Sequence, residues 1–548
     1  MARRRERRRT AVPTQTPRAR AHAAAQSLRL PPELLARVLS LLSWRDSASL
    51  ALTSSELRST VLSVASTSFE WRSTAVLTAS DDFGLESANE VVERLVNNHG
   101  GWADAAFAPS LALISVRCVT PRPWTKGGFW REAAEAVDAA GLLPPRCLVV
   151  GMLAVQEPSG GHGPMAVDVA VGHLPCTTVQ CAEFDRKELR RNTRIDGVCE
   201  LENPFPDTAD GASADFLLFS VNPRSAEELA SAVAQWRAKD SAIVGGVFPF
   251  TDIVCPLMAY RTKAPSFIAS AGQQGRRRKR RATAPRRQDS PLLPVGEVIM
   301  PSNLVIRLCG QVRLRPWASS GFAPVTPVVR CEHVMTLPAM PRVATYDLVS
   351  VYQPDPLEPP AMPVKLKDLL RERIDLSSDK FLQIVASPEP AVVEALLLEA
   401  AGQRDARNRV PASPYMINCG YNALDDAFLS IDAHWERGWF ATFLGHCTAS
   451  ARSRLQVAID QAHRQCEARE EVPFGMLKVS MPTGDDDDGD RLGDDLVSTF
   501  SIETDQQIGP LAMMSGLVPS EDGWHACVQQ YNTCGVLFCR PKANAPSV

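Results

Sequence analysis

The feature that most restricts the fold of this chain is an alternation of strand-like and helix-like segments over residues 105–262. Apolar runs typical of buried strands are Leu111–Val116, Arg146–Met152, Met165–His173, Cys176–Phe184, Ala214–Ser220 and Ala242–Val247. Amphipathic runs at Phe129–Ala140 and Ser225–Lys239 lie between pairs of these strands. Such alternation is typical of β-α-β crossovers with parallel strands. We therefore predict a mixed α/β (α+β) fold in which Ser225 caps its helix and Met165–His173 forms a hairpin with Cys176–Phe184.

A second constraint is an apolar stripe near the N-terminus. It opens at Leu30-Pro31-Pro32-Glu33, where proline presets a helical φ and Glu33 lies in the first turn, which favours an anion. Apolar residues then recur with a helical period at Leu34, Leu35, Val38, Leu39, Leu41 and Leu42. Ser43–Asp46 breaks this run, and a second amphipathic stretch continues to Val61. A segment this short cannot bury both apolar faces alone, so we expect its spare surface to bind a partner, although an ordinary helical hairpin of a larger domain fits the same pattern.

These residues resemble an F-box, the short helical motif that docks a substrate receptor onto the Skp1 subunit of a cullin-based ubiquitin ligase. The matching residues are Leu30, Pro31, Glu33, Leu34, Leu35, Val38, Leu39, Leu42, Asp46, Leu50 and Ala51. The match fades over Leu52–Arg58, which lacks the Val-Cys-Arg-x-Trp-like ending of the family. The resemblance implies a substrate receptor of an SCF-type ligase, with a Skp1-like adaptor, a cullin and a protein substrate as partners. The residues it implies for Skp1 binding are Leu30, Pro31, Leu34, Leu35, Val38, Leu39 and Leu42.

The rest of the chain resembles the FIST domain (F-box and intracellular signal transduction), in two halves. The resemblance is carried by Ala214–Pro223, Ala242–Phe250, Leu304–Trp317, Phe474–Ser480, Gln507–Pro510 and Tyr531–Phe538. Gln507 replaces an acidic residue of the family, and residues 400–450 match nothing in it, so we interpret them as an insertion or a diverged helical lid. The resemblance implies a body that grips a target protein. Because FIST domains outside the F-box setting are thought to bind small ligands, a small-ligand sensor is an alternative, and a viral F-box decoy that occupies host Skp1 is a third.

Charge and composition divide the chain into six expected parts. They are a disordered basic tail (1–27), the F-box-like motif (28–66), a connector (67–104), a FIST N-like domain (105–262), a disordered basic linker (263–296) and a FIST C-like domain (297–548). The linker contains Arg276, Arg277, Arg278, Lys279, Arg280 and Arg281. This run is typical of a nuclear import signal and equally of a solvated linker, so we expect the nucleus, the cytoplasm or both, in the host cell if the chain is viral.

No residue pattern indicates catalysis, a bound metal or a cofactor. The 14 cysteines include no CxxC pair, so they fit buried free thiols in a reducing compartment. Cys534 and Cys539 lie an odd number of positions apart, so on a strand they face opposite sides. Gly245 and Gly246 lack a phosphate-loop motif and are interpreted as close-packing glycines. Asp485–Asp488 lacks the register of a calcium loop and is interpreted as a solvated acidic loop.

Composition narrows the classes of partner. A hydrophobic fraction of 45% and a charged fraction of 22% are ordinary for a globular protein. No apolar run approaches the ~18 residues that a membrane helix needs, so we expect no membrane association. The formal net charge of −3, with few aromatic residues near the basic runs, disfavours a nucleic-acid partner.

Overall fold

The computed structural model covers the whole chain and describes part of it in detail. The described residues are 32–39, 42–53, 55–78, 107–118, 128–155, 165–194, 199–205, 214–236, 241–248, 255–263, 293–320, 322–337, 340–354, 361–373, 381–394, 415–422, 427–431, 437–446, 448–480, 497–504, 506–510, 526–529 and 532–542. Leu30, Pro31, the basic run Arg276–Arg281 and the acidic run Asp485–Asp488 lie outside them.

Two six-stranded sheets share one arrangement of strands. In order across the first sheet, the strands are β1 (Glu70–Thr78), β4 (Met165–His173), β2 (Leu111–Cys118), β3 (Leu148–Val155), β8 (Leu257–Arg261) and β9 (Val298–Ile299). In order across the second, they are β5 (Thr177–Phe184), β10 (Asn303–Gly310), β6 (Ala214–Ser220), β7 (Ile243–Val247), β22 (Gln506–Pro510) and β23 (Ala526–Gln529). The central pair of each is parallel, and a helix follows its first strand: α7 (Gly128–Ala139) or α9 (Pro223–Trp236). The predicted mixed α/β fold and its β-α-β crossovers are therefore confirmed.

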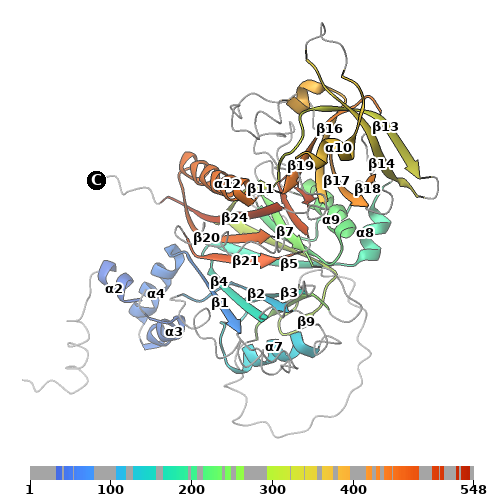
Figure 1. The fold of residues 1–548 in the computed structure, drawn as a ribbon. Coiled ribbons are helices and arrows are strands. Elements are labelled where there is room, and N and C mark those ends of the chain that lie inside the picture. The colour runs from blue at the N-terminus through green and yellow to red at the C-terminus, as the bar shows by residue number, and fades with distance from the viewer. Residues whose placement is uncertain are drawn as a thin grey trace, which may run out of the picture.

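A third sheet completes a common core (Figure 1). It has four strands in the order β11 (Arg313–Ser320), β24 (Asn532–Pro541), β20 (Glu471–Ser480) and β21 (Thr499–Glu503), and α12 (Thr448–Ala468) packs on it. One face of each sheet contributes to the shared core, and the other face packs against a helix. The alternation of strand side chains explains this division, because Leu111 and Leu113 point into the shared core while Ala112 and Ile114 join the cluster with α7.

The described residues between 322 and 446 form an antiparallel assembly around their own apolar cluster. Its elements are β12 (Phe322–Pro324), β13 (Val329–Leu337), β14 (Met340–Val351), β15 (Val364–Lys365), α10 (Leu366–Arg371), β16 (Phe381–Ser387), β17 (Tyr415–Asn422), β18 (Ala427–Ile431) and β19 (Phe440–His446). The pairings β13–β14–β18–β17–β16–β19–β13 close on themselves. The interpretation of residues 400–450 as a helical lid is therefore wrong. The described residues there are mainly strands of this ring, and helix α12 starts only at Thr448.

Three expectations about connections are also wrong. β4 and β5 form no hairpin, since β4 pairs with β1 and β2 while β5 pairs with β10 in the other sheet. The basic linker does not divide the protein into two domains, because strands on its two sides share both six-stranded sheets. β8 pairs with β9 across it, and β10 lies between β5 and β6. The expected connector contains β1, an edge strand of the first sheet. These errors share one cause. Which strands pair with each other is decided by residues far apart in the chain, and local sequence carries little information about such pairing.

The prediction that Ser225 caps the helix of the second crossover is wrong. α9 begins after Asn222, whose side-chain oxygen accepts a hydrogen bond from the backbone N–H of Ser225 at 3.2 Å. Asn222 is therefore the capping residue, and Ser225 lies buried within the first turn. The short helix α8 (Arg186–Asn192) packs beside α9.

A buried carboxylate joins the second and third sheets. The oxygens of Asp215 in β6 accept hydrogen bonds from the backbone N–H groups of Ala242 at 2.7 Å and of Leu314 in β11 at 2.9 Å. Burial raises the pKa of Asp215 to about 6, against the opposing effects of these two hydrogen bonds and of the positive charges on Arg313 and Arg315. Asp215 therefore links two sheets at the cost of a partly desolvated charge.

None of the helices among the described residues has the length and apolar character needed to cross a membrane.

Candidate functional site

The apolar N-terminal segment folds into three helices, here called the N-terminal helical unit: α2 (Pro32–Leu39), α3 (Trp44–Thr53) and α4 (Ser55–Thr67). α2 begins at Pro32, as the proline pair predicts. The predicted break at Ser43–Asp46 is shorter in the structure, because α3 already begins at Trp44. The hydroxyl of Ser43 accepts a hydrogen bond from the backbone N–H of Asp46 at 3.2 Å and donates one to its carboxylate at 2.7 Å, which caps α3. Both α2 and α3 pack against α4.

The start of α3 fixes the helical unit to the body of the protein. Trp44 packs against the cluster that lies between the first sheet and α7. The guanidinium of Arg45 donates hydrogen bonds to the carbonyl oxygens of Ala140, at 3.1 Å, and Gly141, which follow the last residue of α7. A cation at the C-terminus of a helix also interacts favourably with the helix dipole. Arg45 therefore joins one end of the helical unit to α7.

The end of α4 provides a second attachment. His173, the last residue of β4, places Nε2 2.8 Å from the carbonyl oxygen of Ala65 in α4 and Nδ1 2.7 Å from the carbonyl oxygen of Ala108. The thiol of Cys176 donates to the carbonyl oxygen of Ser66 at 3.8 Å. Carbonyl groups in the last turn of a helix lack partners within the helix, and here the body supplies them. The unit is thus held at two separated points, with α2 lying on its outer side (Figure 1).

Two of the predicted binding residues lie on the surface of α2. Leu34 exposes 49% of its surface and Val38 exposes 40%. They are four positions apart, so they lie one turn apart on the same face of the helix. The side chain of Leu35 lies outside the described residues, and Leu42 is half-buried just beyond the helix.

Leu39 does not match its expected role. It is fully buried, at 0% exposure, so it holds α2 within the structure and its side chain does not face a partner. The prediction assigned the whole apolar periodicity of α2 to one binding face. A short helix that packs on its neighbours needs an inward apolar side as well, and Leu39 supplies that side.

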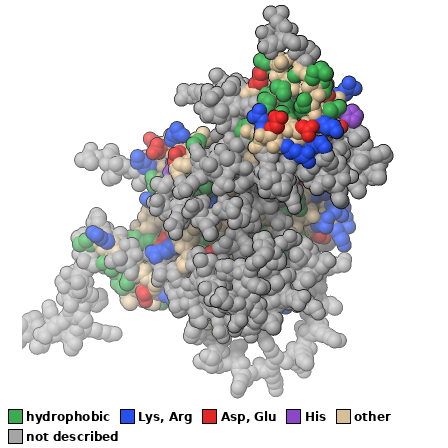
Figure 2. All heavy atoms as spheres, viewed as in Figure 1, with side chains coloured by type: hydrophobic (Ala, Val, Ile, Leu, Met, Phe, Trp, Pro, Cys, Tyr) green, Lys and Arg blue, Asp and Glu red, His purple; other side chains and the backbone are tan. Residues whose placement is uncertain are grey.

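The other two helices of the unit also expose large apolar residues. Leu52 near the end of α3 exposes 84% and Leu62 in α4 exposes 58%. Figure 2 shows hydrophobic side chains among charged ones on the surface of this unit. Large apolar side chains exposed singly are ordinary in proteins, whereas this small helical unit exposes four of them.

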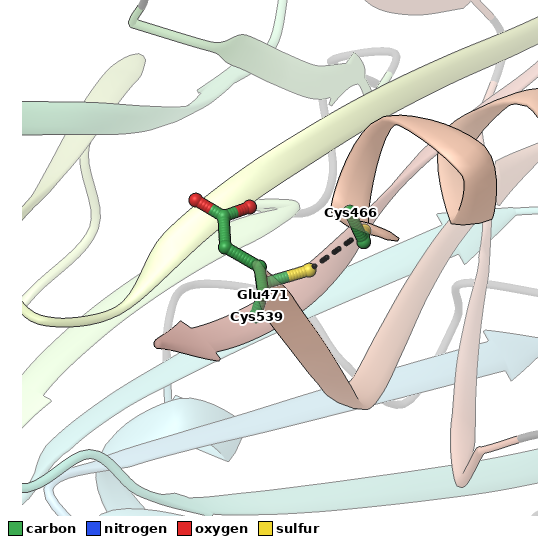
Figure 3. Close-up of side chains that lie close together, drawn as sticks. All are labelled: Cys466, Glu471 and Cys539. Atoms are coloured by element: carbon green, nitrogen blue, oxygen red, sulfur yellow. Dashed lines mark hydrogen bonds between the residues drawn. The ribbon is translucent and has the colours of Figure 1, made fainter. Parts of the chain in front are cut away.

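A second group of residues was not predicted from the sequence. Cys466 in α12 and Cys539 in β24 place their sulfur atoms 3.3 Å apart, and Glu471 at the start of β20 lies beside them (Figure 3). One donor atom from each of the three lies within 4.8 Å of the others, a spacing that suits a metal ion. Sequence reasoning missed this group because its members come from three elements, and Cys466 and Cys539 are 73 positions apart.

Two further predictions, one for a cysteine pair and one for a glycine pair, are confirmed. Cys534 lies in the shared core while Cys539 faces α12, so the two lie on opposite faces of β24 as predicted. A Cβ atom on Gly245 would lie 1.6 Å from the carbonyl oxygen of Leu218, and one on Gly246 would lie 2.4 Å from the side chain of Thr504. The glycine pair therefore permits close strand packing, as interpreted.

Comparison with known proteins adds no relative. None of the protein-family models matches the chain, and no match is found among the curated proteins.

Proposed function

We propose that this protein is a substrate receptor of an SCF-type cullin-RING ubiquitin ligase that docks onto a Skp1-like adaptor through the N-terminal helical unit. The observation that carries the proposal is the exposed pair Leu34 and Val38 on α2, a helix whose opposite side is already buried through Leu39. The F-box resemblance names Skp1 as the occupant of that surface. The chain itself contributes no catalysis and acts in the nucleus, the cytoplasm or both.

Attachment of the helical unit to the body fits the work of a receptor. A receptor accelerates ubiquitin transfer by holding the lysines of its target near the charged conjugating enzyme, which replaces a bimolecular encounter by a local one. A mobile docking helix would lose much of this effect. Arg45 at the start of α3 and His173 at the end of α4 both bond the unit to the body, so the adaptor and the body keep a defined relative orientation.

We assign target binding to the rest of the protein. It contains two parts, the three packed sheets and the ring formed by β13, β14 and β16–β19. We assign recognition of the protein substrate to one or both of these.

Size-exclusion chromatography of the full chain with purified Skp1 and cullin tests the proposal. We expect the chain to elute with both proteins in a stoichiometric complex, and the cullin to join only when Skp1 is present. Elution of the chain by itself at micromolar concentrations would refute Skp1 docking.

A further inference from the structure

We propose that Cys466 and Cys539 form a reversible disulfide, which makes the junction of α12 and β24 a redox-modification site. The two sulfur atoms are 3.3 Å apart, and one thiol donates a hydrogen bond to the other sulfur. Both side chains are buried, and they belong to separate elements that pack in one apolar cluster. Formation of the bond needs a small approach of the sulfur atoms, to about 2.05 Å.

The hydrogen bond between the two thiols favours their reaction. Arg315 in β11 forms a two-pronged ion pair with Glu471: its Nε donates to one carboxylate oxygen at 2.5 Å and its terminal nitrogen donates to the other. The hydrogen bond from Cys539 lowers the pKa of Cys466. Burial and the negative charge of Glu471 oppose this effect, and the positive charge of Arg315 adds to it. The same hydrogen bond, together with burial, raises the pKa of Cys539. Within this proposal we assign Cys466 as the attacking thiolate and Cys539 as the thiol that resolves the intermediate.

The same geometry disfavours a metal ion. Two thiolates and a carboxylate are a reasonable set of zinc ligands, but both oxygens of Glu471 are already bonded to Arg315. Figure 3 shows the two thiols facing each other while the carboxylate turns away from them. A divalent cation there would also lie beside a buried guanidinium, which repels it.

The reaction takes a small hydroperoxide as the oxidant. The thiolate of Cys466 attacks the O–O bond of hydrogen peroxide; an S–O bond forms, the O–O bond breaks, and hydroxide leaves and takes a proton to become water. The sulfur of Cys539 then attacks the sulfenic sulfur, loses its proton, and displaces the oxygen as a second water. The two thiols lose two electrons and the peroxide gains them. A dithiol reverses the step by exchange.

The bond would fasten the C-terminal strand to the helix that covers it. The backbone N–H of Lys542, just after β24, already donates to the carbonyl oxygen of Glu470, just after α12, at 2.7 Å. A disulfide would turn this contact into a covalent closure of a long loop, which restricts the unfolded chain and raises the melting temperature.

Peptide mapping of the full chain tests the proposal. The protein is treated with a small molar excess of hydrogen peroxide, alkylated, and digested with trypsin and chymotrypsin, which separate Cys539 from Cys534 by cleavage after Phe538. We expect a crosslinked peptide pair containing Cys466 and Cys539, its loss after dithiothreitol, and a higher melting temperature for the oxidised wild type. Cys466→Ser and Cys539→Ser should each remove the crosslink and the shift in melting temperature, while the exposed Cys176 is oxidised alike in all three proteins.

Three results would overturn the proposal. The first is a wild type in which Cys176 is oxidised while Cys466 and Cys539 remain free thiols that can be alkylated after unfolding. The second is a disulfide that joins either of the two to another cysteine. The third is native mass spectrometry in which one Zn²⁺ ion binds the wild type, binds neither serine variant, and blocks oxidation; the group would then be a metal site. Since the wild type alone decides the first two, failure of a variant to fold leaves the test intact.

Discussion

Replacement of both Leu34 and Val38 by aspartate should abolish adaptor binding without unfolding the protein. Leu34 exposes 49% of its surface and Val38 exposes 40%, so a partner can still cover nearly half of each side chain. Full burial of a leucine or valine contributes about 1.5–3 kcal/mol, so the uncovered part contributes about 1 kcal/mol per residue. The double variant loses about 2 kcal/mol of this and also leaves two carboxylates without partners in an apolar interface, at several kcal/mol each. Since each 1.4 kcal/mol changes an affinity tenfold, we expect binding to weaken by at least about 100-fold.

Biolayer interferometry with immobilised Skp1 and the full chain provides the measurement. Val457→Asp is a matched control, because Val457 exposes 47% of its surface on the remote helix α12. It should bind as the wild type does, and both variants should keep the wild-type melting temperature, since exposed positions tolerate substitution to within about 0.5 kcal/mol. A double variant that binds within about threefold of the wild type would show that this face of α2 is not the docking surface.

Three further predictions follow from the contacts described above. Leu39→Ala, at a fully buried position, should lower the free energy of unfolding of the helical unit by about 2–5 kcal/mol; amide hydrogen exchange in α2 measures this, and no change would mean that Leu39 does not hold α2. His173→Ala removes the ring contacts with the carbonyl oxygens of Ala65 and Ala108, where a hydrogen bond contributes about 1 kcal/mol, so amide exchange in α4 should accelerate; an unchanged rate would contradict the attachment. The folded pKa of Asp215 is about 6, above its unfolded value, so the folded state binds more protons between about pH 4 and pH 6. Stability from this group is therefore full below about pH 4 and falls by about 2–3 kcal/mol as the pH rises through 6; denaturant unfolding against pH should show this slope in the wild type relative to Asp215→Asn, and parallel curves would refute it.

Local pattern predicted the parts of the fold that depend on neighbouring residues. β4 and β6 match their predicted bounds of Met165–His173 and Ala214–Ser220, and both crossover helices lie where amphipathic spacing placed them. In each case the apolar periodicity and the flanking polar residues that indicate the element lie within one short segment. The start of α2 at Pro32 was predictable for the same reason.

Pairing between distant segments was not predictable in this way. Residues 415–422 and 427–431 carry strand-compatible sequences, yet their place in the ring depends on β14 and β16, which lie far away in the chain. The similarity of β4 and β5 to a hairpin was equally misleading, since the turn between them leads from one sheet to another. The proximity of Cys466 and Cys539 was unpredictable for the same reason, because the two residues are 73 positions apart in the chain.

The candidate docking surface was predicted in part. The helical period identified α2 and its apolar residues, but it could not tell the inward side from the outward side, because apolar residues occur on both. Burial in the folded structure distinguishes Leu39 from Leu34 and Val38, and α2 packs against α4. The attachment through Arg45 and His173 joins residues about 100 positions apart, and no local pattern indicates it.

The most direct test of the docking proposal is amide hydrogen exchange of the full chain in the absence and presence of saturating Skp1. We predict slower exchange in residues 32–39 and in neighbouring parts of α3, with unchanged exchange in the ring strands β17 and β18. Unchanged exchange throughout the helical unit, or protection confined to the body, would contradict the account.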